Sequence, residues 1–347
     1  MITRRIQGGS EPVRDFIVRN VHRFPSDIAR RVSEQFGISR QAANAHLKRL
    51  VEEGALVGDG ETRARKYRLC AIATFTQQYT IAPGLAEDVD WRNDLLPFLG
   101  ALPKNVTDIW YYGFTEMFNN AIDHSEGTTI VVQAVKTAAD VQVSILDDGI
   151  GIFRKIQRDL KLLDERHAVL ELAKGKLTTD PARHTGEGIF FSSRMFDQFR
   201  ILSGETYFSH DQKDEGDWIL QNHQDFGGTY VAMKLWNHTS RTLNKVFAKF
   251  TVGEELSFSK TIVPVRLARY GEEALVSRSQ AKRLLARVDR FAVVIFDFAE
   301  VRAIGQAFAD EIFRVFAAEH PRMELHSIHA APGIEAMIKR AKENVVS

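Results

Sequence analysis

Hydrophobic residues recur with helical spacing near the middle of the chain. They lie at i, i+4, i+7 and i+11, so they share one face of a helix. The pattern predicts a helix whose core stripe consists of Trp110, Phe114, Met117 and Ala121.

Three polar residues lie on the face adjacent to this stripe, namely Glu116, Asn120 and His124. Partly buried polar groups need partners that an apolar core cannot supply. Glu116 could orient a water molecule, and Asn120 could offer an oxygen to Mg²⁺. The alternative interpretation is a helix whose polar side simply faces solvent.

Two stretches with strand alternation follow the helix, at residues 128–135 and 141–146, and the residues between them favour a hairpin. The second stretch leads directly into Asp147, Gly149 and Gly151. Glycines spaced by one residue allow a close backbone approach to a ligand, and a carboxylate before them can accept from an exocyclic amine. This arrangement favours adenine over guanine.

Two further glycine motifs come later in the chain. Gly186 and Gly188 precede a predicted helix at residues 189–196, where free backbone N–H groups and the helix dipole attract phosphate. Gly228 and Thr229 then open a predicted final strand at residues 230–235. The four motifs together predict a nucleotide site.

The order of these motifs over residues 90–235 resembles the GHKL, or Bergerat-fold, ATPases, which include gyrase, Hsp90, sensor histidine kinases and MutL. The resemblance implies an α/β sandwich with a mixed sheet and helices on one face. It implies that ATP and Mg²⁺ are the cofactors. It assigns Glu116 as the water-activating base, Asn120 as the Mg²⁺ residue, Asp147, Gly149 and Gly151 as the adenine box, Gly186 and Gly188 as the phosphate-side box, and Thr229 as the threonine near adenine.

One residue departs from the family pattern, because Glu187 places an acid between the phosphate-side glycines. It must point away from phosphate or pair with a cation. Between the two glycine boxes, residues 153–184 have the length and charge of a lid. We expect helical pieces and one cation that meets the γ-phosphate, among Lys155, Arg158, Lys161, Lys174, Lys176 and Arg183.

The composition limits the number of domains and the class of protein that the chain can form. The chain has 347 residues, 44% of them hydrophobic and 26% charged, which is ordinary for two or three soluble domains. No continuous apolar run follows the early arginines, so we expect neither a signal peptide nor a membrane-spanning helix. Cys70 is the single cysteine, which excludes an internal disulfide. We predict a cytoplasmic, multidomain α+β protein with domains at residues 1–72, 73–240 and 241–347.

The first 70 residues are basic, with fourteen Lys or Arg against eight Asp or Glu in a chain whose net charge is +1. Apolar stripes predict helices ending near Phe24, at residues 27–36 capped by Ser26, and at residues 40–53 capped by Ser39. A hairpin follows at residues 55–69. This order resembles the winged helix-turn-helix of bacterial transcription regulators.

The winged helix resemblance implies double-stranded DNA as a partner, although some winged modules bind protein instead. Four residues of the third helix lie off its apolar stripe and offer donors to base edges and phosphates, and the cations of the hairpin would hold the backbone. The predicted DNA-binding residues are Arg40, Gln41, Asn44 and Lys48 on the helix, and Arg63, Arg65 and Lys66 on the wing.

The last hundred residues alternate strands with helices, which implies a small α/β layer. We predict strands at 261–265, 292–298 and 324–328, and helices at 279–288, 307–316 and 333–341. The segment from Val293 to Phe308 resembles the STAS-like relatives of anti-anti-sigma factors. These domains carry a phosphorylated serine where this chain has Gln306 and Ala307. We therefore expect a module that docks a protein partner or forms a homodimer, and that is no serine substrate.

Three functions are open at this point. The first is an ATP-binding, slowly hydrolysing DNA-binding regulator whose nucleotide state controls the winged module. The second is a protein kinase of the serine or histidine type, although residues 71–105 hold no His to serve as phosphoacceptor. The third is an ATP-gated protein-interaction switch that does not bind DNA. Glu116 favours some hydrolysis, because kinases of this superfamily often lack an acid there.

Overall fold

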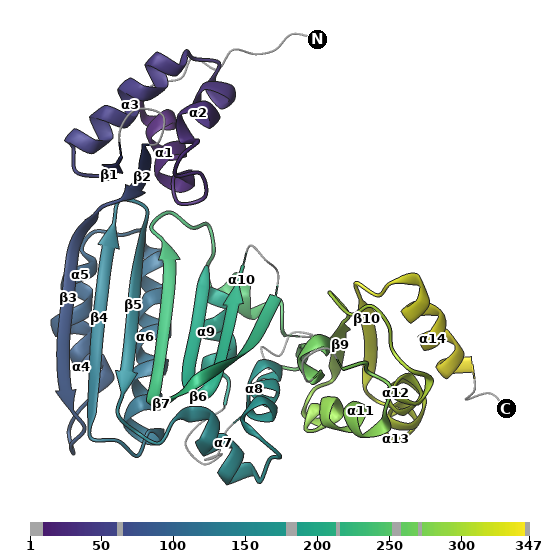
Figure 1. Cartoon of the computed structure of the whole chain (residues 1–347). Helices are drawn as coiled ribbons and strands as arrows, with labels where there is room; N and C mark the ends of the chain where they lie inside the picture. Colours follow the sequence, from purple (N-terminus) through teal and green to yellow (C-terminus); the bar gives the residue numbers. More distant parts are fainter. Residues whose placement is uncertain are drawn as a thin grey trace.

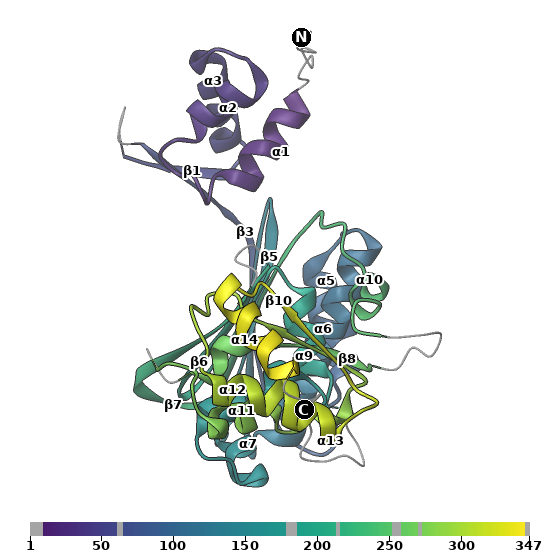
Figure 2. The ribbon, with the colours of Figure 1, turned by 90° about the vertical axis from the view of Figure 1, so that its right-hand side faces the viewer.

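The computed structural model describes residues 10–60, 65–177, 186–212, 216–251, 258–269 and 273–343. It shows a multidomain protein of mixed helices and sheets, whose strands form three separate sheets. The N-terminal part sits at one end of a central sheet, and the C-terminal part lies beside α8 and the β6–β7 edge of that sheet (Figure 1). A view from the side shows that the N-terminal and C-terminal parts lie well apart (Figure 2).

Three helices and a two-stranded hairpin form the N-terminal part. Their apolar stripes meet in one core, which includes Val13, Ile17 and Leu47. Ser39 caps the third helix as predicted, because its hydroxyl accepts from the Ala42 N–H at 3.1 Å. The elements are α1 (Ser10–Asn20), α2 (Ile28–Phe36), α3 (Arg40–Glu52), β1 (Leu56–Asp59) and β2 (Lys66–Leu69).

The predicted Ser26 cap is wrong. Helix α2 begins at Ile28, with Asp27 at the N-cap and no side-chain cap hydrogen bond. The carboxylate of Asp27 instead accepts from Arg30 Nε at 2.8 Å. The acid therefore takes the place at the helix start that the sequence assigned to the hydroxyl.

The N-terminal part is joined closely to the central sheet. Only Cys70 separates β2 from the edge strand β3 (Ala71–Thr80). Ala138 and Ala139, at the turn of the next hairpin, pack into the N-terminal core together with Trp236. The His22 and Trp236 rings are 5.2 Å apart.

The central sheet has the order β3-β4-β5-β7-β6, and all of its neighbouring strands run antiparallel. The prediction of a mixed sheet is therefore wrong for this part. Two of the four pairs, β4–β5 and β6–β7, are hairpins, which force antiparallel pairing, and the pairs β3–β4 and β5–β7 are antiparallel as well. The four strands after β3 are β4 (Thr129–Thr137), β5 (Asp140–Asp147), β6 (Gln198–Asp211) and β7 (Gly216–Trp236).

Helices cover one face of this sheet (Figures 1 and 2). The longest is α6 (Lys104–His124), which has the predicted core stripe, because Trp110, Phe114, Met117 and Ala121 are all buried. Helix α10 packs against α9 and α6, so residues 243–247 lie with the central part. The other helical segments are α4 (Glu87–Asp90), the π-helical turn Trp91–Leu95, α5 (Leu96–Leu99), α7 (Ile152–Leu160), α8 (Glu165–Lys174), α9 (Gly188–Met195) and α10 (Leu243–Phe247).

The C-terminal part has a parallel three-stranded sheet in the order β10-β9-β8. Its strands and main helices lie where the sequence predicted them, to within about three residues at each end. They are β8 (Lys260–Pro264), α11 (Arg278–Leu285), β9 (Val293–Asp297), α12 (Gln306–Asp310), the π-helical segment Glu311–Phe316, α13 (Ala317–Glu319), β10 (Glu324–Ile328) and α14 (Pro332–Glu343), with 3₁₀ turns at Val265–Ala268 and Val288–Arg290. Within the described ranges, no helix combines the length and the apolar character that a bilayer crossing requires.

Candidate functional site

A cavity of about 320 Å³ lies between the helical layer and the sheet. Six of the eight residues that the sequence assigned to a nucleotide site line it, although they come from four separate segments of the chain. These are Glu116, Asn120, Asp147, Gly186, Gly188 and Thr229. Apolar residues such as Met117, Leu172 and Phe190 complete the wall. A pocket of this size with few polar groups is typical of a small-molecule site.

Asp147 ends β5 at the cavity, opposite Thr229 of β7 in the strand register. Its Oδ1 accepts from the Gly149 N–H at 3.0 Å and from the Thr229 N–H at 3.1 Å. Burial raises the pKa of the Asp147 carboxyl, and these two N–H groups oppose the rise. Thr229 in turn accepts from the Ile152 N–H at 3.0 Å through its hydroxyl. The carboxylate is thus fixed in orientation at the wall of the cavity.

Gly149 and Gly151 do not line the cavity, although the sequence assigned them to close ligand approach. A Cβ on Gly149 would lie 2.0 Å from the Ser125 carbonyl oxygen. Gly151 has a φ of +90°, and a Cβ there would lie 2.5 Å from Ser203 Oγ. These two glycines therefore allow close packing against other residues of the protein, and not against a ligand. They seat the end of β5 against α6 and β6, which positions Asp147.

Glu116 faces the start of α9 across the cavity. A Cβ on Gly188 would lie 1.9 Å from Glu116 Oε2, so a larger residue there would displace the Glu116 carboxylate from its present position. Burial raises the pKa of the Glu116 carboxyl, and the nearby Glu187 and Glu87 add to the rise. A carboxylate with a raised pKa is a stronger base than a surface one.

Glu187 is the acid that departs from the family pattern. Burial raises the pKa of its carboxyl, whereas the charge of Lys176 acts to lower it. A cation therefore lies within electrostatic reach of Glu187. Gly186, beside it, has a φ of +72° and accepts from the Leu177 N–H at 3.0 Å. That bond joins the two ends of the segment 178–185, which lies outside the described residues.

The expected lid contains helical pieces, as predicted, namely α7 and α8, although α8 is buried on all sides from Ala168 to Lys174. Of its six cations, Lys155 lines the cavity, with Glu126 Oε1 at 3.1 Å and Asp159 Oδ2 at 3.2 Å from its amine. Lys174 and Lys176 bond to main-chain carbonyls of the C-terminal part instead. Arg183 falls outside the described ranges. Lys155 is thus the lid cation that the described structure brings to the cavity wall.

The predicted DNA-binding residues are exposed wherever the structure describes them. Arg40, Gln41, Asn44 and Lys48 lie along one side of α3, and Lys48 is 3.7 Å from Glu52 Oε1. On the wing, Arg65 and Lys66 are exposed, and the Arg65 guanidinium lies 5.4 Å from the Tyr67 ring centre. Arg63 lies outside the described residues. The helix and the wing both present donors to solvent.

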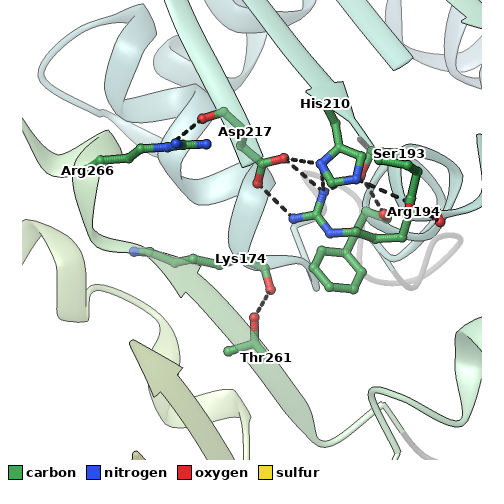
Figure 3. A network of polar contacts seen from close by, with 9 residues as sticks. Lys174, Ser193, Arg194, His210, Asp217, Thr261 and Arg266 are labelled. Carbon is green, nitrogen blue, oxygen red and sulfur yellow. Dashed lines mark hydrogen bonds and ion pairs between the residues drawn. The ribbon is translucent and has the colours of Figure 1, made fainter. Parts of the chain in front are cut away.

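Sequence reasoning missed a buried polar cluster at the far end of α9, shown in Figure 3. Asp217 accepts from Arg194 Nη1 at 3.0 Å and from Arg194 Nη2 at 2.8 Å, and it lies 2.7 Å from His210 Nδ1. No spacing in the sequence indicates this cluster, because its residues come from α9, β6 and the first part of β7, and the predicted strand at residues 230–235 covers only the end of β7. The cluster fixes α9 to the β6–β7 hairpin.

Apolar lining residues were also missed as site residues. Ile145, Leu172, Leu177, Phe190 and Val231 line the cavity. They carry no motif, since an apolar residue that faces a ligand looks the same in sequence as one that faces the core. The helical and strand periodicities alone would have placed them on the inner faces.

A model of the STAS-like domain of unknown function (DUF4325) matches residues 280–335. The match runs from α11 to the start of α14 and includes Gln306 and Ala307 at the start of α12. The C-terminal part is therefore STAS-like, as the sequence predicted. No curated protein matches the chain.

Proposed function

We propose that the chain is an ATP-binding, slowly hydrolysing DNA-binding regulator, built from a winged helix-turn-helix, a GHKL or Bergerat-fold ATPase domain and the STAS-like domain. The observation that carries the proposal is the convergence of four separate sequence motifs on one cavity. The motif residues Glu116, Asn120, Asp147, Gly188 and Thr229 all face it. Residues more than a hundred positions apart in the sequence thus line the same pocket, which supports a shared role.

Each group in the cavity suits a part of an adenine nucleotide. Asp147 is a fixed acceptor in an apolar surrounding, which matches an exocyclic amine. The N-terminus of α9 offers free N–H groups, and Lys155 supplies a cation at the wall. Asn120 would hold Mg²⁺, which when bound neutralises phosphate charge. Glu116 would orient the attacking water and take its proton.

Two observations favour regulation over phosphotransfer to a protein. Gln306 and Ala307 offer no hydroxyl at the start of α12, so the chain's own STAS-like domain presents no serine there. Residues 71–105 form β3 and a short helical segment without any His. The kinase remains the rival function. STAS-like domains often mediate protein interactions, so a protein partner or a homodimer through this domain is part of the proposal.

The route from nucleotide to DNA-binding module is short. Strands β5 and β7 pair from Asp147 and Thr229 at the cavity to Asp140 and Trp236 at the other end. There Trp236 packs into the core of the N-terminal part. A change at the cavity that shifts this strand pair would be felt where the N-terminal part docks. An interaction switch without DNA would use the same route.

The nucleotide prediction is that ATP and ADP bind with Mg²⁺ while GTP binds far more weakly. Asp147→Asn should weaken ATP binding, because an amide can place a donor where the adenine amine needs an acceptor. Calorimetry measures both effects. Asp148→Asn is the matched control, since the Asp148 carboxylate bonds to the Thr128 and Thr129 N–H groups away from the cavity. Equal affinity of the wild type for ATP and GTP would overturn the adenine site.

The DNA prediction is that substitutions on the wing and on the helix α3 change different properties of DNA binding. Lys66→Ala should weaken binding to all duplex sequences and reduce the salt slope by about one unit for each phosphate that is no longer bound. Gln41→Ala or Asn44→Ala should relax sequence preference and leave the slope nearly unchanged, because base-edge contacts release few counterions. A salt titration of binding by the full chain to selected DNA separates these outcomes.

The control for the DNA test is Arg49→Gln on the same helix. Arg49 Nε already donates to Glu53 Oε1 at 2.8 Å, so the substitution should change the slope least. If the full chain binds no duplex DNA at low salt, the N-terminal module is a protein-binding adaptor and the interaction switch becomes the better proposal.

A further inference from the structure

One wall of the cavity is made by residues 172–177, the end of α8 and the turn after it, which we call the α8 wall. Leu172 and Leu177 line the cavity. Lys174 and Lys176 lie between them and turn to the other side, toward the STAS-like domain. The same short segment therefore faces the proposed nucleotide on one side and a different domain on the other.

Lys174 is fully buried in this contact, with 1% of its side chain exposed. Its amine donates to Glu171 Oε1 at 2.7 Å, to the Arg283 carbonyl at 3.2 Å and to the Ala286 carbonyl at 2.8 Å. Its own carbonyl accepts from Thr261 Oγ1 at 2.6 Å (Figure 3). Both the side chain and the backbone of Lys174 are thus bonded across the domain boundary.

Lys176 makes a second, reciprocal contact. Its amine donates to the Arg290 carbonyl at 3.0 Å, and Arg290 Nη1 donates to the Lys176 carbonyl at 2.7 Å. The amine also lies 5.0 Å from the ring centre of Phe291 and 5.6 Å from that of Phe258. Two main-chain carbonyls of the α8 wall are therefore held by side chains of the C-terminal part.

Helix α9 provides an independent link between the cavity and the same domain. Phe190 lines the cavity, and its ring centre is 4.8 Å from that of Phe258. At the other end of α9, Arg194 holds Asp217, whose carbonyl accepts from Arg266 Nε at 3.0 Å. The α8 wall and α9 therefore both contact the C-terminal part, α9 directly through Phe190 and indirectly through Asp217 of β7.

Burying a lysine is costly unless its charge is paired and its protons are bonded. Undocking the STAS-like domain would remove the two carbonyl acceptors of Lys174 and leave Glu171 as the described partner of its amine. The α8 wall would then have to rearrange toward water. Its position, and with it the placement of Leu172 and Leu177, depends on the docked domain.

We infer that the STAS-like domain holds the α8 wall in place, so that nucleotide binding and the docking of this domain are energetically linked. The inference rests on the proposed nucleotide site and adds its regulation. A protein partner that draws the STAS-like domain away would loosen the nucleotide. By reciprocity, bound nucleotide would strengthen the docking by the same factor.

The test uses two full-length variants that each remove one hydrogen bond to the α8 wall. Thr261→Val removes the hydroxyl that bonds the Lys174 carbonyl, and Arg290→Ala removes the guanidinium that bonds the Lys176 carbonyl. Neither residue lines the cavity. Calorimetry should show ATP binding weakened roughly five-fold or more in each, the lower end of usual coupling. Lys339→Ala is the control, because its side chain is 78% exposed on α14 and pairs with Glu343.

Hydrogen exchange on the same proteins gives the reciprocal readout, which also shows whether each variant is folded. ATP should slow amide exchange in residues 260–264 and 172–177 of the wild type, and less so in the variants. If the wild type binds ATP, both variants match it and exchange in β8 does not respond, the linkage is overturned and the nucleotide site stands. If the wild type binds no adenine nucleotide, both proposals fall.

Discussion

Replacing Glu116 with Gln should leave ATP bound and reduce its hydrolysis by roughly two powers of ten or more, the usual effect of removing a general base. The amide keeps the shape of the side chain but cannot take a proton from water. Burial raises the pKa of Glu116, so the carboxylate that the substitution removes is an unusually basic one. Single-turnover hydrolysis and nucleotide affinity, measured on the same protein, separate chemistry from binding.

Two further substitutions on α6 make the Glu116 result specific. Asp108→Asn is the control, because Asp108 pairs with Lys104 at 2.8 Å on the exposed side of the same helix. It should hydrolyse ATP at the wild-type rate. Asn120→Ala should lose the Mg²⁺-dependent part of binding. Wild-type turnover in both Glu116→Gln and Asn120→Ala would assign the activity to other residues.

Replacing Asp217 with Ala should lower the free energy of unfolding by about 3 to 5 kcal/mol, the range seen when one partner of a buried ion pair is removed. The side chain of Asp217 is 2% exposed and that of Arg194 12% exposed. Without Asp217, the guanidinium would stay buried with no carboxylate. Urea unfolding followed by circular dichroism measures the difference. Asp225→Ala on the same strand is the control, since Asp225 is 55% exposed and pairs with Arg154, so its removal should cost less than about 1 kcal/mol.

The cluster around Asp217 also sets a dependence of stability on pH. Burial and the charge of Arg194 lower the pKa of His210, so the folded state resists the proton that the unfolded chain takes up near pH 6.5. Stability from His210 is therefore present above that pH and is lost as the pH falls below it. Despite its burial, Asp217 keeps a pKa well below its ordinary range, held there by Arg194 and His210, so its contribution is lost only in stronger acid. In His210→Gln the first of these two decreases in stability should disappear, and an unchanged profile would contradict this role of His210.

The helix α6 and the ends of β5 and α9 could be predicted because their signals are local. A stripe such as Trp110, Phe114 and Met117 fixes both the helix and its buried side. Glycine motifs with a fixed place relative to a strand or a helix mark where the chain turns, as at Gly188, the first residue of α9. Asp147 and Thr229 were predicted as single site residues, and the antiparallel register of β5 and β7 explains why they meet.

The rest depends on partners that are distant in sequence. Lys174 was one of the candidate lid cations, yet it is buried, and its amine donates hydrogen bonds to carbonyls more than a hundred residues away. Gly228 was expected to begin a strand, but it lies within β7, where its φ of +79° lets it pass the Asp147 carbonyl. No local pattern contains such contacts, which form only when whole modules dock.

The single residue between β2 and β3 has a consequence for how such a protein can change in evolution. Side chains of a strand alternate between two faces, so each added residue reverses the side toward which everything after it points. One residue inserted beside Cys70 would turn the N-terminal module to the opposite side of the sheet, away from the turn at Ala139 that it now rests on. Two inserted residues would restore the orientation and only lengthen the connection. Only insertions of an even number of residues at this connection would therefore keep the N-terminal module on the same side of the sheet. We expect related proteins to differ in length here by even numbers of residues.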